Sequence, residues 1–167
     1  MPYQKSIELL TGDYTRALSV AERFNINSGA RPYRRVRASL TQAIDFALSL
    51  TNEVKQGNTI DVGSVHGSDT FLDKAKALEI ARQKERTAYL TGTVAVDVSQ
   101  RDLGRLATIR KAFNLGSDRQ AATLAVRLYQ SACDNLWRGN SFSIEERGGT
   151  YRSLDTDKLR EKLTFKY

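Results

Sequence analysis

The hydrophobic pattern of the segment from Thr93 to Glu145 changes its period partway along. Valine occupies every second position over Val94–Val98, and this period of two predicts a short strand with one buried face. Apolar residues then recur at every third or fourth position, which predicts a helix. They are Leu103, Leu106, Ile109 and Phe113.

A second, longer helix is predicted after a turn. Leu115-Gly116 predicts the end of the first helix, because glycine is the usual residue just past a helix end. Ser117 is a predicted N-cap, and Gln120 three residues later completes a capping box. The apolar side of the longer helix carries Ala122, Ala125, Val126, Tyr129, Ala132, Cys133 and Leu136, and Gly139-Asn140 predicts its end. One strand and two helices bury too little apolar surface to fold alone, so this unit needs a second copy.

The N-terminal part of the chain supplies a candidate for that copy. Residues 7–26 align without a gap with residues 96–115, and residues 37–62 align with residues 119–144. In the first copy, ten residues (27–36) separate the two aligned blocks. In the second copy only three residues (116–118) separate them, so the first copy has seven extra residues. The two copies share identical polar residues and the same Gly-Asn sequence after the long helix. Similarity between amphipathic helices alone would not require these matches. The alternative is chance similarity between two amphipathic helix pairs. The identical pairs include Asp13/Asp102, Arg16/Arg105, Phe24/Phe113, Asn25/Asn114, Arg37/Arg119, Thr41/Thr123, Ala43/Ala125, Ser49/Ser131, Gly57/Gly139 and Asn58/Asn140.

The alignment divides the chain into four parts. Residues 1–62 are the first strand-helix-helix copy, residues 63–91 a linker with a helix, residues 92–146 the second copy and residues 147–167 a basic C-terminal tail. We expect the two copies to form one compact domain, with Gln4–Leu10 as the first strand. Further predictions are a first helix over Asp13–Ile26, a long helix from about Pro32 to Gln56, a linker at Gly63–Gly67, a helix over Asp69–Leu90, a flexible Arg147–Gly149 and a short helix over Leu154–Leu163. The extended pieces Asn58–Val62 and Asn140–Ile144 are expected to pair with each other.

Composition places the chain among soluble globular proteins. It has 167 residues, of which 40% are hydrophobic and 27% charged. No apolar run approaches the roughly 18–20 residues of a membrane span, and the N-terminus does not resemble a signal peptide. The single cysteine, Cys133, excludes an internal disulfide framework and fits a cytoplasmic location; its place on an apolar helix side predicts a buried, unreactive thiol. The net charge of +7 favours a polyanionic partner.

The residues that carry catalysis are sparse. The only histidine is His66, which excludes triads and metal sites built on several histidines. There is no cysteine pair for zinc and no glycine loop of the phosphate-binding spacing. The seven tyrosines have no activating base near them in the sequence. We therefore expect no enzyme activity, no cofactor and no metal.

The second copy resembles the ribbon-helix-helix family of DNA-binding proteins. The residues that carry the resemblance are the strand Val94–Ser99, the helix Leu103–Phe113 and the turn Leu115-Gly116-Ser117-Asp118-Arg119. In that family two units interlock, their strands pair into an antiparallel ribbon that enters the major groove, and the start of each second helix grips a phosphate. Two units in one chain resemble the tandem members, several of which are accessory proteins of conjugative DNA transfer. The implied fold is mainly α, with a two-stranded ribbon and two units related by a pseudo-two-fold axis.

The resemblance and the alternation together assign candidate site residues. The base-facing positions of the ribbon are Gln4, Ser6, Glu8, Thr93, Ala95 and Asp97. The phosphate-binding positions are Arg31, Arg34, Arg35, Arg37, Ser117 and Arg119, because helix N-termini and arginines bind phosphate. The ribbon positions include no arginine or lysine, and both copies place a carboxylate at the same point, Glu8 and Asp97. Each carboxylate either accepts from a base amine or opposes the phosphates.

These features predict a protein that binds double-stranded DNA, as a transcriptional repressor or an accessory factor of DNA transfer. The alternative is a protein–protein adaptor that uses the same fold without reading bases. In the adaptor, the linker helix or the C-terminal tail would dock the partner. Neither reading involves a membrane.

Overall fold

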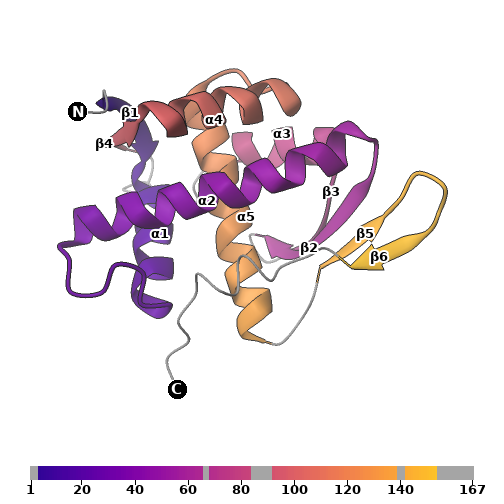
Figure 1. Cartoon of the computed structure of the whole chain (residues 1–167), viewed down its shortest axis with the longest axis horizontal. Helices are drawn as coiled ribbons and strands as arrows, with labels where there is room; N and C mark the ends of the chain where they lie inside the picture. The colour runs from indigo at the N-terminus through magenta and orange to yellow at the C-terminus, as the bar shows by residue number, and fades with distance from the viewer. Residues whose placement is uncertain (1–3, 66–67, 84–91, 139–141, 154–167) are drawn as a thin grey trace.

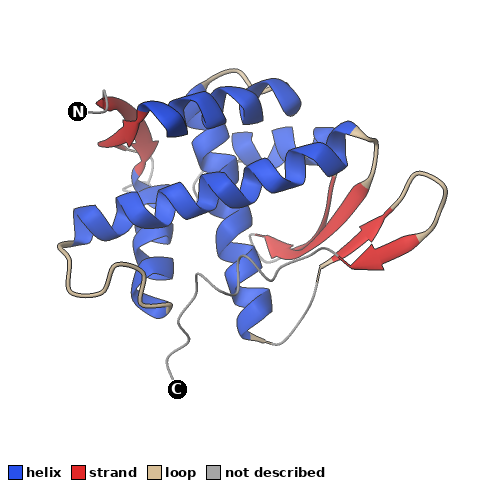
Figure 2. Ribbon diagram, viewed as in Figure 1, coloured by secondary structure: helices blue, strands red, loops and turns tan. Residues whose placement is uncertain are grey.

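The computed structural model describes residues 4–65, 68–83, 92–138 and 142–153, and every structural statement below refers to these residues. They form a mainly helical protein with five helices and two small antiparallel sheets (Figures 1 and 2). The elements in chain order are β1 (Gln4–Leu10), α1 (Thr11–Arg23), α2 (Pro32–Lys55), β2 (Thr59–Val65), β3 (Ser68–Leu72), α3 (Lys74–Arg82), β4 (Thr93–Ser99), α4 (Gln100–Ala112), α5 (Asp118–Trp137), β5 (Ser143–Glu145) and β6 (Tyr151–Ser153).

Strands β1 and β4 pair antiparallel into a two-stranded ribbon, which confirms the predicted pairing of these distant segments. Ile7 lies opposite Val96 at the centre of the ladder. The side chains on one face are buried, as the alternation predicts: Ile7, Leu9, Val96 and Val98. The opposite face points away from the core.

The helices cover the buried face of the ribbon and supply most of the core. Helix α2 crosses α5 in the middle of the molecule, with the ribbon beside the N-terminal half of α2 and strands β2 and β3 below its C-terminal half (Figure 1). Pro32 begins α2 as predicted, since its fixed φ suits a first helical turn. The apolar side of α5 is buried almost throughout, because α1, α2, α3 and α4 all contact it.

Helices α1 and α4 end in the same way. Asn25 and Asn114 have positive φ angles of 58° and 55°, and asparagine tolerates this left-handed conformation better than most residues. The next N–H then bonds back into each helix, from Ile26 to the Ala21 carbonyl and from Leu115 to the Arg110 carbonyl, both at 2.8 Å. The sequence prediction that Leu115-Gly116 ends α4 misplaces the stop: Asn114 adopts the left-handed conformation two residues earlier. The separate prediction of a helix over Asp13–Ile26 also extends too far, because α1 ends at Arg23.

The second sheet has the strand order β3-β2-β5-β6. Ile60 of β2 pairs with Ile144 of β5, so the predicted contact between these two pieces is confirmed, and both side chains are buried. Gly57, with a φ of 84°, ends α2 and allows the chain to turn into β2. The matching stop at Gly139-Asn140 lies outside the described residues.

The linker differs from its prediction. Gly63–Val65 belongs to β2 instead of a linker, and residues 68–72 form β3 where a helix was predicted from Asp69. Pairing explains the change: Leu72 is buried opposite Ile60, and this packing outweighs local helix propensity. The helix, α3, begins only after Asp73, whose side chain accepts a hydrogen bond from the Lys76 N–H. Residues 84–91 of the predicted helix are outside the described part.

The residues after the second copy also differ from their prediction. Arg147–Gly149 forms the turn between β5 and β6 instead of a flexible tail, with the Gly149 N–H donating to the Glu146 carbonyl. Arg152 of β6 donates to Glu146 and Glu53, and its guanidinium holds the pKa of Glu53 below its usual value. The predicted helix over Leu154–Leu163 lies outside the described residues.

A buried polar cluster joins α1 to α5. Asp13 is fully buried; it accepts a hydrogen bond from Thr123 at 2.7 Å and from the Arg127 Nε at 3.2 Å. Arg127, 2% exposed, also donates to the carbonyls of Ile80 and Gln83 at the end of α3. A single buried arginine therefore holds α1, α3 and α5 together.

A second polar cluster joins α4 to α2. Asp102 accepts a hydrogen bond from Thr41 at 2.7 Å, and Arg105 pairs with Asp45. The Arg105–Asp45 pair is partly exposed, with 19% and 29% of the two side chains accessible. Solvent therefore screens this pair more than the Arg127–Asp13 pair.

Replacing Arg127 by methionine is expected to lower the free energy of unfolding by about 2 kcal/mol, because buried acceptors on Asp13, Ile80 and Gln83 lose their donor while Arg16 still pairs with Asp13. Arg105→Met is the matched control, and its partly exposed pair predicts a loss of about 1 kcal/mol or less. Urea denaturation followed by circular dichroism measures both. Equal losses in the two variants would contradict the distinct roles assigned to these arginines.

Candidate nucleic-acid interface

The outer face of the ribbon is polar and largely open to solvent. Ser6, Glu8, Thr93 and Ala95 are exposed, and Asp97 is half-buried. Gln4 is part of β1, but its side chain is outside the described part. The cross-strand pairs on this face are Gln4 with Ser99, Ser6 with Asp97, and Glu8 with Ala95. Five of the six predicted base-facing side chains are thus described, and all five lie on the face away from the core.

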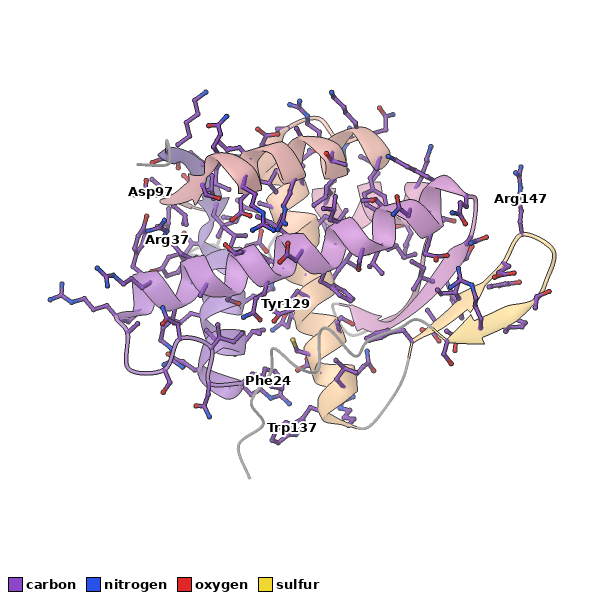
Figure 3. The ribbon with its side chains drawn as sticks, in the orientation of Figure 1. Phe24, Arg37, Asp97, Tyr129, Trp137 and Arg147 are labelled. Carbon is purple, nitrogen blue, oxygen red and sulfur yellow. The ribbon has the colours of Figure 1, made fainter. Side chains whose placement is uncertain are left out.

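The first turns of α2 hold the outer edge of β4. The Asp97 N–H donates to the Tyr33 hydroxyl at 2.8 Å, and its carbonyl accepts from the Arg37 Nε at 3.1 Å (Figure 3). The Arg37 guanidinium lies over the Tyr33 ring, 6.0 Å from the centroid. These bonds satisfy backbone groups that an edge strand would otherwise expose, and they fix α2 against the ribbon.

The predicted phosphate-binding arginines of α2 have different environments. Arg31 and Arg34 are exposed, and Arg37 is half-buried. Arg35 instead donates to the carbonyls of Ile26 at 3.3 Å and Ala21 at 2.9 Å, around the end of α1. These bonds occupy its guanidinium, so we do not include Arg35 in the interface.

An open hollow of about 410 Å³ lies between the start of α2 and the junction of β4 with α4. Three arginines line it: Arg34 and Arg37 from α2, and Arg101 from α4. Asp97 and Asp102 also reach it, but each carboxylate accepts a hydrogen bond, from Ser6 at 2.7 Å and from Thr41 at 2.7 Å respectively. The hollow therefore combines three guanidinium groups with two carboxylates that already have donors.

Arg34 and Arg101 lie in first helical turns, where the helix dipole opposes a cation. The first turn of α2 has no acidic residue and no side-chain cap in the described structure. Arg101 is the second residue of α4, whose start is capped by Ser99 and also contains Asp102. A cation near a helix N-terminus costs stability, by about 0.3–1 kcal/mol, where a carboxylate would contribute a similar amount. Helix stability therefore does not account for the arginines, whereas an anionic ligand would be attracted by both the arginines and the dipole.

The start of α5 differs from that of α2 in its capping and its charges. Ser117 is the N-cap as predicted, and its hydroxyl accepts from the Gln120 N–H at 3.2 Å. The Gln120 side chain accepts from the Gly116 N–H at 2.8 Å, one residue before the position that a capping box would use. Asp118 lies in the first turn, 3.6 Å from the Arg110 guanidinium. Arg119 is exposed, so this helix start presents one arginine of its own beside a carboxylate that Arg110 already pairs.

Sequence reasoning missed two residues of this interface. The site residues predicted from the sequence include neither Tyr33 nor Arg101. The sequence could have indicated Arg101, because it comes shortly after the predicted strand and lies in the first turn of the next helix. Tyr33 had none, because its contact with Asp97 joins segments 64 residues apart.

Other reactive groups lie away from this surface. Cys133 is buried, as predicted, and burial raises the pKa of its thiol to about 12, so it stays protonated at neutral pH. Burial also raises the pKa of Tyr129. In the described ranges, no three His, Cys, Asp or Glu side chains are grouped so that they could hold a metal ion. None of the helices described has the length and apolar character needed to cross a bilayer. His66 is not among the described residues.

Comparison of the chain with models of known protein families, with curated proteins and with solved structures gives no match in any of the three.

Replacing Tyr33 by phenylalanine is expected to lower the free energy of unfolding by about 1 kcal/mol, because the Asp97 N–H loses its acceptor. Tyr151→Phe is the control, since Tyr151 is 67% exposed. Urea denaturation compares the two variants with the unmodified chain. A Tyr33 variant as stable as the control would show that the bond contributes nothing to holding α2 on β4.

Proposed function

We propose that this chain binds double-stranded DNA without catalysing a reaction. The β1–β4 ribbon would enter the major groove, and the arginines at the starts of α2 and α4 would contact the phosphate backbone. The observation that carries the proposal is the group Arg34, Arg37 and Arg101 around one hollow beside the ribbon. A two-stranded ribbon fits the major groove, and arginine binds phosphate oxygens in bidentate pairs.

The proposal includes a ribbon-helix-helix arrangement with a pseudo-two-fold axis. In a two-fold symmetric antiparallel ribbon, one residue must lie opposite its own equivalent. Here Ile7 lies opposite Val96, and the sequence alignment matches these same two residues. The register of the ladder thus supports an axis between them.

Hydrogen bonds between the two copies support the same axis. Thr123 bonds to Asp13, and Thr41 bonds to Asp102, each at 2.7 Å. The alignment matches Thr41 with Thr123 and Asp13 with Asp102, so the two bonds are equivalent. Identical polar residues in the two copies therefore make identical contacts across the proposed axis.

The biological role follows from the family resemblance. We propose a transcriptional repressor or an accessory factor of DNA transfer acting in the cytoplasm. In either role the electrostatic contacts would provide affinity for any duplex, and the exposed ribbon residues would select the sequence.

Affinity for duplex DNA is expected to fall steeply with salt, with a slope of about −0.9 for each phosphate contact on a double-logarithmic plot. Replacing Arg34 and Arg101 together by alanine should weaken binding to all sequences alike and flatten the slope by about 1.8. Fluorescence anisotropy of a labelled random-sequence duplex, titrated at several salt concentrations, measures both effects.

Two comparisons keep this experiment specific. Arg138→Ala removes an exposed arginine just after α5 and should leave the salt slope unchanged. The Arg34 and Arg101 variant should be as stable as the unmodified chain or slightly more so, because two cations leave helix N-termini. An unchanged slope in a fully folded double variant would remove this hollow from the interface.

Glu8 provides a test of opposite sign. Its carboxylate is exposed opposite Ala95 and would face the phosphates without a neutralising partner. Glu8→Gln should tighten binding to any duplex by about two- to five-fold at low salt. Glu145→Gln is the matched control, because Glu145 is an exposed carboxylate on β5 of the second sheet, away from the ribbon. If Glu8→Gln instead lowers preference for a selected site and leaves random-sequence affinity unchanged, Glu8 reads a base amine.

A protein–protein adaptor is the second candidate, and exposed aromatic residues favour it. Phe71 of β3 and Tyr151 of β6 are 57% and 67% exposed on the two edge strands of the second sheet. Exposed aromatic side chains are enriched in protein interfaces. The adaptor reading predicts that Phe71→Ser and Tyr151→Ser weaken a protein partner, and that the unmodified chain shows no salt-dependent binding to duplex DNA.

A further inference from the structure

The two copies differ in length where each long helix begins. The alignment matches Arg37 with Arg119. Arg119 is the second residue of α5, whereas Arg37 is the sixth residue of α2. Helix α2 therefore begins about one turn earlier than its equivalent. This turn, Pro32–Arg35, comes from the segment in which the first copy has its extra residues.

The extra turn is fixed on both sides. Tyr33 bonds to the edge of β4 at 2.8 Å, and Arg35 bonds to two carbonyls around the end of α1. Arg34, between them, is exposed and lines the hollow. The inserted residues thus add one exposed arginine, on a turn whose backbone is held beside the ribbon.

The charges of the two halves are unequal. The β4 side has Arg34, Arg37 and Arg101 around its hollow. On the β1 side, Arg119 matches Arg37, while the position that matches Arg101 is Gly12, which is buried. Asp118, paired with Arg110, adds a carboxylate to the start of α5, which Ser117 already caps, whereas the equivalent start of α2 has neither an acidic residue nor a side-chain cap. The β4 side also has two carboxylates, Asp97 and Asp102, each with a hydroxyl donor. The imbalance that favours anion binding on the β4 side is therefore the uncapped start of α2 and its additional arginine.

The two carboxylates on the outer face of the ribbon also have unequal surroundings, and the difference again favours the β4 side. Asp97, nearer to α2, accepts a hydrogen bond from Ser6 and lies beside the three arginines. Its equivalent, Glu8, lies opposite Ala95, which has no donor in its side chain. Both the helix starts and the ribbon thus make the β4 side the more attractive one for a polyanion.

We infer that the chain binds duplex DNA in one orientation, on a target without two-fold symmetry. The phosphates next to the β4 edge are held by Arg34, Arg37 and Arg101, while the β1 side contributes mainly base contacts. This inference rests on the proposed function and specifies the class of DNA target. It distinguishes the chain from a symmetric dimer, whose two equal halves favour a palindromic site.

The first test compares the halves on a labelled random-sequence duplex. Arg34→Ala and Arg101→Ala should each flatten the salt slope by about 0.9, and Arg119→Ala should flatten it by less than half as much. Asp118→Asn should raise affinity several-fold, a gain that a folding defect cannot produce. An Arg119→Ala effect equal to that of Arg34→Ala, or no gain from Asp118→Asn, would overturn the inference.

The second test uses a duplex selected by the full chain from a random pool. Hydroxyl-radical footprinting should show stronger backbone protection on one side of the site, and the Arg34 and Arg101 double variant should lose protection on that side only. Equal protection of two inverted half-sites would overturn the inference but leave DNA binding in place. Failure of the unmodified chain to bind any duplex at low salt would instead overturn both the inference and the proposed function.

Discussion

The pairing of β1 with β4 is the interaction on which the rest of the structure depends. Two seven-residue strands form only a marginal ribbon in water, so the ribbon is stable only when its apolar face is covered. Ile7, Leu9, Val96 and Val98 are covered by helices from both parts of the chain. Because the strands are far apart in sequence, neither part can complete this arrangement alone, and the ribbon and the helices must form together.

Polar contacts within the core determine how the helices meet around the ribbon. Asp13 and Asp102 each accept a hydrogen bond from a threonine on a helix of the other copy. A buried carboxylate is costly unless it is bonded, and a shift of α5 along α1 would remove the bonds from Thr123 and Arg127, leaving Asp13 with Arg16 alone. Arg127 extends this constraint to α3 by bonding to its last carbonyls. These contacts therefore specify one helix packing more strongly than apolar contacts could.

The proposed interface contains arginines whose positions at helix N-termini do not favour helix stability. Arg34 and Arg101, at the starts of α2 and α4, oppose the helix dipoles. The contacts of Tyr33 and Arg37 with the β4 backbone hold the start of α2 beside the ribbon. A fixed helix start reduces the conformational entropy lost when an anion binds. The extra turn of α2 makes this surface one-sided, which is the physical basis of the inferred orientation.

The sequence by itself determined the elements with strong local signals. The valine alternation predicted β4, Pro32 the start of α2, Ser117 the cap of α5, and the repeat the pairing of β1 with β4. Only the tertiary structure decided β3 and β6, because strands of five and three residues form through their neighbours. It also decided the site: Arg35 is held by carbonyls of a preceding segment, while Arg34, Arg37 and Arg101 meet around one hollow. Local patterns specify periodicity and helix ends, but which charges converge depends on contacts between residues distant in the chain.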